Sequence, residues 1–354
     1  MTYYPVFIPT LNRYDRFKDC IESLRQCTYA DKTELVVGLD YPPADRYRDG
    51  YEKIKAFLPT IKGFTKVTIF ERDHNFGAME NWYALADYCL KHYDAFIATE
   101  DDNVFSPCFL DYMNQALNRF RNDKRIVSVG GYSHPTSLGT CTNSAYLSYT
   151  HSAWGEGFWR DKYRQVKRTI EDDSFFLHMV RTQELSMRIA NIYPRGYWSL
   201  LDILKSGNRD CWDDLKWSLY NITTGHFQLQ PAVSLVRNMG CDGSGLHCDV
   251  DKTFSQQTIS PDTTFDMTDN PSIQRIDIEG RGPRWQDMPA DPIEWSDAME
   301  ALYRRARRVR LKYTRPWWWL FRLLGHSRSG YGLIYKLCIK IGLLHSTDLT
   351  KKLH

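Results

Sequence analysis

The sequence predicts an α/β fold in which a mainly parallel sheet carries helices on both faces. In the first 130 residues, short apolar runs of strand length alternate with longer segments whose apolar residues recur at helical spacing. Strand–helix–strand repetition of this kind produces parallel neighbours in one sheet. The chain has 354 residues, 42% of them hydrophobic and 25% charged. These values are typical of one large globular domain or of two closely joined ones.

The expected elements follow one another in a regular order. The run Val6–Pro9 predicts a first strand, and the segment after it, residues 14–27, places Phe17, Ile21 and Leu24 on one helical face. Further strands are expected at residues 34–39, 66–70, 95–99 and 126–129, and further helices at residues 45–58, 77–92 and 107–121. The helix at 107–121 begins after Ser106-Pro107, a favourable cap and first turn. No internal repeat is present.

Polar residues follow three of these strands. Asn12 and Arg13 come after the first strand, Asp40 after the second, and the triplet Glu100-Asp101-Asp102 after the fourth. Open parallel sheets bind ligands at the carboxyl ends of their strands, so this placement predicts a binding site there. The chain lacks a G-x-G-x-x-G motif after the first strand and lacks a G-x-x-x-x-G-K-[ST] motif, which argues against dinucleotide and P-loop sites.

The acid triplet is the first candidate for chemistry. Three carboxylates after a buried strand repel one another, and a divalent cation offsets that repulsion. Oxygen ligands on such a turn suit Mg²⁺ or Mn²⁺, which also bridge to phosphate oxygens. The alternative is a solvated acidic turn that caps the next helix. The position of the triplet at a strand end favours the metal.

Two further segments carry candidate functional groups. A helical segment begins at Trp212-Asp213-Asp214. A carboxylate beside an indole is partly desolvated, which raises its pKa and allows it to act as a general base. The alternative is that these acids only cap the helix. Gly243-Ser244-Gly245-Leu246-His247 is a flexible segment whose backbone N–H groups can approach phosphates. The alternative for this second segment is an ordinary glycine turn.

The C-terminal segment has a different composition. Residues 303–354 contain 13 Lys and Arg but one acid, Asp348, so the net charge of +3 hides an acidic body and a basic tail. Residues 317–321 add aromatic side chains to this basic segment. A mixture of aromatic and cationic residues predicts contact with an anionic membrane surface. The alternative is a docked or solvated helix, and nucleic acid is not expected as a partner.

The cellular location is predicted from the N-terminus and the cysteines. The N-terminus shows no secretory signal pattern and no apolar run reaches the roughly 18 residues of a membrane span. The nine cysteines show no paired metal spacing such as C-x-x-C, which indicates reduced thiols. We expect a cytoplasmic protein, with peripheral contact to the inner face of the cell membrane through the tail as a further hypothesis.

Taken together, these segments resemble nucleotide-sugar glycosyltransferases of the GT-A fold. The likeness is to the N-acetylglucosaminyltransferase I family and to bacterial glycosyltransferases of similar layout. It rests on the acid triplet with Ser106-Pro107-Cys108-Phe109-Leu110 after it, on W-D-D at a later helix start, and on a Gly/Ser loop after a strand that carries Pro231. The resemblance covers residues 4–248 and implies a Rossmann-like, GT-A type sheet, whereas the basic helical tail is expected from composition alone.

The resemblance also implies a domain organisation. Residues 1–135 would form the nucleotide-sugar-binding half, and residues 136–260 the acceptor-binding and catalytic half of the same domain. A loop-rich segment, 261–302, and the basic aromatic tail, 303–354, would follow. The membrane anchor and stem that precede the domain in the N-acetylglucosaminyltransferase I family have no counterpart in this sequence.

On the donor side the resemblance assigns five roles. Asp102 would hold the Mn²⁺ or Mg²⁺ ion bound to the donor diphosphate. Asp101 and Glu100 would contact the ribose and the transferred sugar. Asp40 would bind the uracil, and Arg13 the polar edge of the nucleotide or a phosphate.

The resemblance assigns roles to five further residues, of which the first three lie on the acceptor side and the last two belong to the diphosphate loop. Asp213 would deprotonate the acceptor hydroxyl, while Trp212 and Asp214 would contact the acceptor. Ser244 would lie on the loop that closes over the diphosphate, and His247 has a counterpart after the same loop in bacterial relatives.

The function implied is metal-dependent transfer of GlcNAc or a related hexose from a UDP-sugar to a hydroxyl of a glycan or lipid-linked oligosaccharide, as in polysaccharide biosynthesis. One base and one metal suffice for inversion, whereas a covalent route requires a second carboxylate, for which Glu156 is the candidate.

One alternative function is that of a sugar nucleotidyltransferase, which would need a basic, glycine-rich loop where the chain has Pro9-Thr10-Leu11-Asn12-Arg13. Another is a catalytically inactive sugar-binding protein at the membrane.

Overall fold

The computed structural model describes residues 1–134, 144–182, 212–243 and 252–273, with scattered positions between 185 and 200. The chain divides into two compact units. The first contains Met1–Lys167 and His226–Ile276, and the second contains Arg168–Gly225 and Asp277–His354. The chain therefore leaves the first unit after Lys167, returns to it at His226 and leaves it again after Ile276. The tail predicted at 303–354, the loop at Ser244 and most of the segment 261–302 lie outside the described residues.

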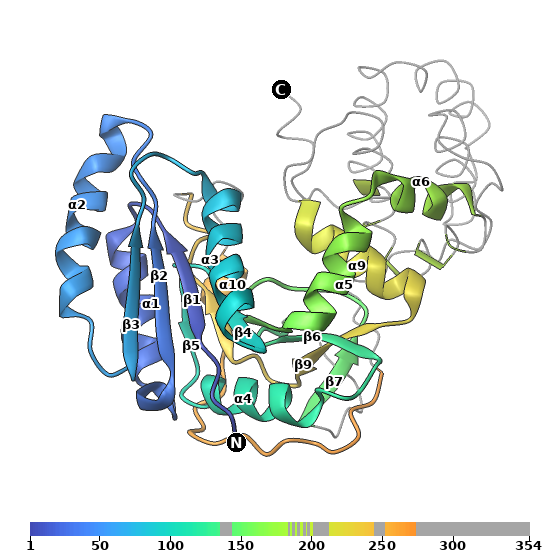
Figure 1. Cartoon of the computed structure of the whole chain (residues 1–354). Coiled ribbons are helices and arrows are strands. Elements are labelled where there is room, and N and C mark those ends of the chain that lie inside the picture. Colours follow the sequence, from blue (N-terminus) through green and yellow to red (C-terminus); the bar gives the residue numbers. More distant parts are fainter. Residues whose placement is uncertain are drawn as a thin grey trace, which may run out of the picture. The chain divides into compact units, whose positions relative to one another are not determined.

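An eight-stranded sheet forms the centre of the first unit (Figure 1). Its strand order is β3-β2-β1-β4-β8-β6-β9-β7. These strands are β1 (Val6–Thr10), β2 (Glu34–Leu39), β3 (Lys66–Glu71), β4 (Ala95–Ala98), β6 (Ile126–Gly130), β7 (Ala145–Ser148), β8 (Glu156–Trp159) and β9 (Phe227–Pro231). Only β7 and β8 run against the other six strands. The predicted fold class, a mainly parallel α/β sheet, is confirmed.

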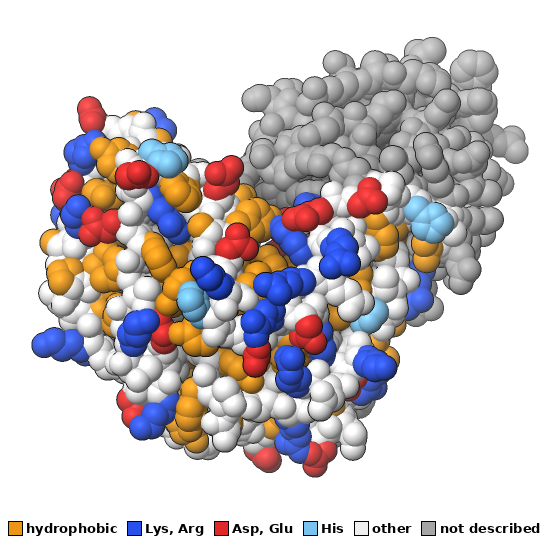
Figure 2. All heavy atoms as spheres, viewed as in Figure 1, with side chains coloured by type: hydrophobic (Ala, Val, Ile, Leu, Met, Phe, Trp, Pro, Cys, Tyr) orange, Lys and Arg blue, Asp and Glu red, His pale blue; other side chains and the backbone are white. Residues whose placement is uncertain are grey.

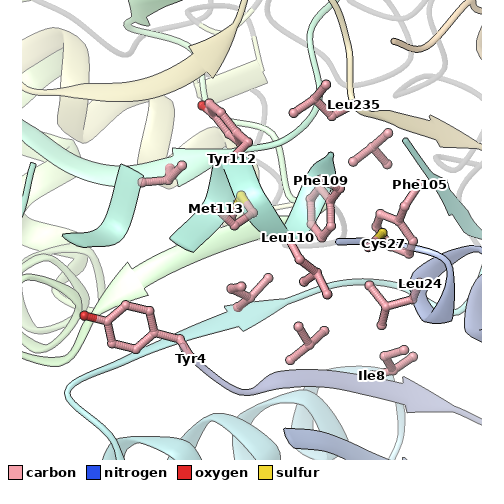
Figure 3. Packing of buried hydrophobic residues seen from close by; sticks show 14 of the residues in the cluster. Tyr4, Ile8, Leu24, Cys27, Phe105, Phe109, Leu110, Tyr112, Met113 and Leu235 are labelled. Carbon is pink, nitrogen blue, oxygen red and sulfur yellow. The ribbon is translucent and has the colours of Figure 1, made fainter. Parts of the chain in front are cut away.

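One face of the sheet packs against α1 (Tyr14–Arg25), α2 (Arg48–Phe57) and α4 (Phe109–Arg119). Alternate strand residues such as Val6, Ile8 and Ile97 point to this face and join a single buried apolar cluster with those helices. Figure 3 shows part of it, where Leu24 of α1 and Leu110 of α4 lie near Ile8. Full burial of side chains of this size contributes roughly 1.5–3 kcal/mol each, so this layer is a main source of stability.

The opposite face carries α3 (Ala78–His92) and the first part of α5 (Arg160–Ile170). Its contacts are mainly aromatic. The Phe96 ring lies 5.6 Å from Phe7 and 5.7 Å from Tyr163 of α5, and Phe7 makes an edge contact with Trp82 of α3 at 5.2 Å. Ring pairs at this spacing are favourable beyond their buried area. Helices therefore cover both faces, as the alternating pattern predicted.

Every strand and helix expected in the first 130 residues is present with shifts of at most a few residues. The regions that lacked a clear pattern contain the unexpected elements. These include β7 to β9 and a separate two-stranded ribbon of β5 (Asn103–Phe105) and β10 (Val236–Asn238). The ribbon matters for the site because it joins the residue after the acid triplet to a loop more than 130 positions later: Asn103 is paired with Asn238.

The second unit contains α6 (Asp173–Arg181) and α9 (Trp212–Thr224). Asp172 caps α6 by accepting a hydrogen bond from the Ser174 N–H at 2.8 Å. Helix α9 buries a stripe that includes Leu215, Leu219 and Ile222. The W-D-D motif therefore begins a helix, as predicted, and both acids lie in its first turn.

The face of the described residues seen in Figure 2 mixes charges of both signs with apolar side chains. Within the described part of the chain, no helix is both long enough and apolar enough to cross a bilayer. A short helix, α10 (Lys252–Ser255), completes the described elements of the first unit.

Candidate active site

The carboxyl ends of β1, β2, β3 and β4 meet at one edge of the sheet. They lead into Thr10, Asp40, Arg72 and the acid triplet respectively. Hydrogen bonds join these strand ends, since the Asp40 N–H donates to the Thr10 carbonyl at 2.9 Å and the Thr10 hydroxyl donates to Asp101 at 2.8 Å. The edge predicted from the sequence therefore gathers polar groups from four strands into one region.

Asp101 and Asp102 form a buried carboxylate pair in the turn between β4 and β5. Their residues are only 5% and 6% exposed. Arg13, which directly precedes α1, forms an ion pair with both: its Nη2 donates to Asp101 Oδ1, and its Nη1 lies 2.7 Å from Asp102 Oδ2. Glu100 is half-buried beside them. Arg13, Asp101 and Asp102, which the sequence predicted on the donor side of the site, are thus in direct contact.

The charges of this cluster depend on one another. Burial raises the pKa of Asp101, the Arg13 guanidinium lowers it, and the neighbouring Asp102 carboxylate raises it again, with a net upward shift. For Arg13, burial alone would lower the pKa, but the two carboxylates raise it overall. Arg13 is therefore permanently charged and compensates a carboxylate pair that would otherwise be costly to bury.

The loop after β10 packs directly on this pair. The Asn238 amide donates to Asp102 Oδ1 at 2.8 Å and to Asn103 Oδ1 at 3.0 Å, and the Met239 N–H donates to the Asp102 carbonyl at 2.8 Å. Arg16 of α1 forms an ion pair with Asp242 at 2.7 Å. These contacts hold the loop of residues 239–243, which leads into the predicted Gly/Ser segment Gly243 to His247, against the acids.

Asp40 organises a second loop at the same edge. Its Oδ1 accepts hydrogen bonds from the N–H groups of Tyr41 (2.9 Å) and Phe76 (2.8 Å). Its Oδ2 accepts from the Gly77 N–H (2.9 Å) and from the Asn75 amide (3.1 Å). Four acceptor positions are about what a carboxylate offers. Asp40 thus fixes residues 75–77, at the start of α3, and its predicted role as a uracil ligand stays a prediction.

Glu156 is enclosed in the first unit. It is paired across the sheet with Ala98 of β4, and its Oε2 lies 2.7 Å from His151 Nε2. The other ring nitrogen of His151 lies 3.1 Å from the Gln228 amide nitrogen. The Glu156 side chain is 5% exposed. This carboxylate is engaged in a buried polar network.

A family model described as glycosyl transferase family 2 matches residues 6–184, just over half of the chain. The chain belongs to glycosyl transferase family 2. The broad resemblance to glycosyltransferases of the GT-A fold is thereby confirmed, whereas the specific likeness to the N-acetylglucosaminyltransferase I family stays a hypothesis. No curated protein sequence matches this one.

Solved structures that match this chain include two nucleotide-sugar complexes. The mannosyltransferase PcManGT from Pyrobaculum calidifontis, in complex with GDP-Man and Mn²⁺, has 16% identity and a TM-score of 0.35 over 56% of this chain and 61% of its own. S. aureus TarS 1-349, in complex with UDP-GlcNAc, has 12% identity and a TM-score of 0.33 over 47% of each chain. The chain spans less than two thirds of the length of either neighbour.

The acids of this family 2 chain suit a divalent ion by their chemistry. Asp101 and Asp102 present carboxylate oxygens, the donors that Mg²⁺ and Mn²⁺ prefer. Among the described residues there is no group of three His, Cys, Asp or Glu side chains placed to hold a metal. In the part of the chain that the structure describes, Asp102 with its neighbour Asp101 would be the side chains to hold such an ion.

Arg72 is a candidate that the sequence reasoning missed. It follows β3, and its Nε donates to the buried Asn81 side chain at 3.0 Å. Among the described residues its buried Nη2 has no hydrogen-bond partner, and burial lowers the pKa of Arg72 although the Asp40 carboxylate opposes that shift. A buried guanidinium N–H without an acceptor at this edge suits an anionic or carbonyl group of a ligand. Its position directly after the third strand was the available signal.

The acceptor-side candidates lie partly in the second unit. Asp213 and Asp214 occupy the first turn of α9, where Asp213 Oδ1 lies 3.4 Å from Lys216 Nζ and Asp214 is exposed. Trp212 begins the helix. Ser244 and His247 lie outside the described residues. The predicted roles of these residues stay predictions.

Gly240 gives a direct test of the contact between loop and acids. A Cβ at this position would lie 2.0 Å from Asp102 Oδ2 and 3.3 Å from Arg13 Nη1. We therefore expect Gly240→Ala to displace the loop or the Asp102 carboxylate. Because a displacement of about 1 Å in a group that contacts the ligand can reduce function by tenfold or more, nucleotide-sugar affinity should fall by at least about tenfold. Isothermal titration calorimetry with UDP-sugar and Mn²⁺ measures this.

Gly63→Ala is the matched control. Gly63 has a positive φ of +97°, unlike Gly240, and its added Cβ would meet only the flexible Arg25 side chain. This variant should lose some stability and keep its ligand affinity. Unchanged affinity in Gly240→Ala would show that the loop does not govern the acid site.

Proposed function

We propose that this protein is a metal-dependent glycosyltransferase that transfers a hexose from a UDP-sugar to an acceptor hydroxyl with inversion at the anomeric carbon. The observation that carries the proposal is the buried Asp101–Asp102 pair at the carboxyl edge of the sheet, in contact with Arg13 and the 239–243 loop. Family 2 membership supports the reaction class. The donor, acceptor and stereochemistry belong to the proposal.

On the donor side, each group has a chemical reason for its assigned role. Asp102 would hold Mn²⁺ or Mg²⁺, and the ion would neutralise charge on the leaving diphosphate. Asp101 and Glu100 would accept hydrogen bonds from ribose and sugar hydroxyls. Arg13 and Arg72 carry guanidinium groups suited to phosphate oxygens or to a carbonyl of the base. Asp40 would contribute at the base through its own carboxylate or through the 75–77 loop that it fixes.

On the acceptor side, Asp213 would remove the proton of the attacking hydroxyl. The acceptor oxygen would form its bond to the anomeric carbon while the bond from that carbon to the diphosphate oxygen breaks, and the proton would go to the Asp213 carboxylate. Trp212 and Asp214 would contact the acceptor, and Ser244 with His247 the diphosphate. A positioned base typically contributes about 10²–10⁴-fold to such a reaction.

Inversion is favoured over a covalent route by the state of Glu156. A double displacement would require a second carboxylate free to attack the anomeric carbon. Glu156 instead is held by His151 at 2.7 Å within a buried network. Disrupting that network to expose the carboxylate would leave buried polar groups unpaired, which is costly.

The sugar and acceptor are proposed on the resemblance noted in the sequence. UDP-GlcNAc is the first donor to test, and a glycan or a lipid-linked oligosaccharide is the proposed acceptor. The basic aromatic tail would hold the protein at an anionic membrane surface, where a lipid-linked acceptor resides.

Donor binding tests the proposal directly. With Mn²⁺ present, titration with UDP-GlcNAc, UDP-Glc, UDP-Gal, UDP-GalNAc and GDP-Man should show binding of one UDP-sugar, and removal of the metal with EDTA should abolish it. Selective binding of GDP-Man would refute the uridine assignment. Binding of a nucleoside triphosphate with release of pyrophosphate would refute the transferase assignment.

A further inference from the structure

Arg13 occupies the place at which a cation would offset the acid pair. Its two guanidinium nitrogens are divided between Asp101 Oδ1 and Asp102 Oδ2. The other oxygen of Asp102 accepts from the Asn238 amide at 2.8 Å. Both oxygens of the proposed metal ligand therefore already face a hydrogen-bond donor.

We propose that Arg13 is a built-in counter-ion that competes with the divalent cation, so that Asp102 takes the metal together with the donor diphosphate and not beforehand. This inference rests on the proposed function. It assigns Arg13 a second role beside nucleotide contact, because the arginine sets the order in which metal and donor bind.

The charges at the site support this order. Arg13 already compensates one of the two buried carboxylates, and a bare divalent ion would bring the net charge of these three groups from −1 to +1, close to the guanidinium. Repulsion between these cations acts in a region where Asp101 and Asp102 are about 95% buried, so water screens it weakly. A diphosphate that enters with the metal supplies the missing negative charge and a new acceptor for Arg13.

The geometry permits Arg13 to change partners. It lies at the N-terminal boundary of α1, with φ −86° and ψ 67°, outside the regular helix. The Arg13 side chain is 23% exposed whereas those of the two acids are 7% exposed, so Arg13 is the most accessible of the three to an entering ligand. Arginine binds phosphate oxygens in the same two-pronged manner as carboxylates. A short rotation of the side chain exchanges one anion for the other.

Mn²⁺ binding in the absence and presence of UDP tests the proposal. Free Mn²⁺ is counted by its EPR signal as it is titrated with wild-type protein and with Arg13→Gln. We expect wild-type protein to bind Mn²⁺ weakly alone and at least about tenfold more tightly with UDP. Arg13→Gln should bind Mn²⁺ alone at least about tenfold more tightly than wild type, with a smaller further gain from UDP. Equal or weaker Mn²⁺ binding by the variant without UDP would overturn the inference.

Lys18→Gln is the matched control. It removes the same charge from α1, but Lys18 is exposed and lies outside the contacts that hold the loop against the acid pair. Its Mn²⁺ affinity should stay within about twofold of wild type; a gain as large as that of Arg13→Gln would indicate a general charge effect and overturn the proposal.

Arg13→Lys guards against loss of folding, because lysine keeps a charge that compensates the buried acids. The lysine ammonium group is a point charge and cannot bridge both carboxylates in the same way. The Mn²⁺ affinity of Arg13→Lys should therefore lie between those of wild type and Arg13→Gln. If wild type binds neither UDP nor Mn²⁺ with UDP, the proposed function fails. If it binds both and the Arg13 variants do not gain Mn²⁺ affinity, only the competition fails.

Discussion

Replacement of Asp102 by asparagine is expected to weaken Mn²⁺-dependent UDP-sugar binding by more than about a hundredfold. Loss of a residue that merely supports a metal ligand typically costs about 10–100-fold in affinity, and loss of the ligand itself should exceed this. Asparagine keeps the shape and an oxygen acceptor for the Asn238 amide, which donates to Asp102 at 2.8 Å. The variant therefore removes the charge with little change in packing. Calorimetric titration with and without Mn²⁺ measures the effect.

Asp111→Asn is a suitable control for this variant. Asp111 is also a buried acid of the first unit, but its carboxylate supports the core by accepting from the Phe265 N–H at 2.8 Å and from the Gln115 amide at 2.9 Å. Its replacement should lower the melting temperature and leave donor binding intact. Metal-dependent binding that survives in Asp102→Asn would place the metal on another residue.

Replacement of Asp213 by asparagine is expected to lower turnover by about 10²–10⁴-fold, the usual contribution of a general base. Donor affinity should change little, because the proposed role of Asp213 concerns the acceptor proton alone. The signature is therefore a loss in kcat with an unchanged Kd for the UDP-sugar. Single-turnover transfer assays combined with donor titration separate the two quantities.

Asp214→Asn provides the comparison within the same helical turn. Both acids lie in the first turn of α9, so both variants weaken the favourable interaction with the helix dipole to a similar extent. Asp214 is exposed, and its loss should raise KM for the acceptor more than it lowers kcat. Similar losses of kcat in the two variants would indicate that helix stability, not proton transfer, explains the effect of Asp213→Asn.

Local patterns predicted the first half of the sheet because the interactions that determine it are local. Val6–Thr10, Glu34–Leu39 and Ala95–Ala98 are apolar runs separated by helices with clear periodicity. Strand direction and the shared carboxyl edge follow from that alternation. The same rule located Arg13, Asp40 and the acid triplet, and it would have located Arg72 had it been applied to the third strand.

Contacts across long separations could not be inferred in this way. The ribbon that pairs Asn103 with Asn238 is made of three-residue strands, which give too short a pattern to recognise. The close approach of Gly240 to Asp102 depends on that ribbon. Likewise, the four donors to Asp40 come mainly from the 75–77 loop, and only the folded backbone reveals that this acid organises a loop.

The measurement that tests the central claim most directly is product analysis after incubation with UDP-GlcNAc, Mn²⁺ and a hydroxyl acceptor. The proposed function predicts release of UDP, dependent on Mn²⁺ and absent in Asp102→Asn, together with a glycosylated acceptor of inverted anomeric configuration. The proposal would be contradicted if neither UDP-GlcNAc nor any other UDP-sugar tested released UDP. It would also be contradicted if the protein instead released pyrophosphate from a nucleoside triphosphate.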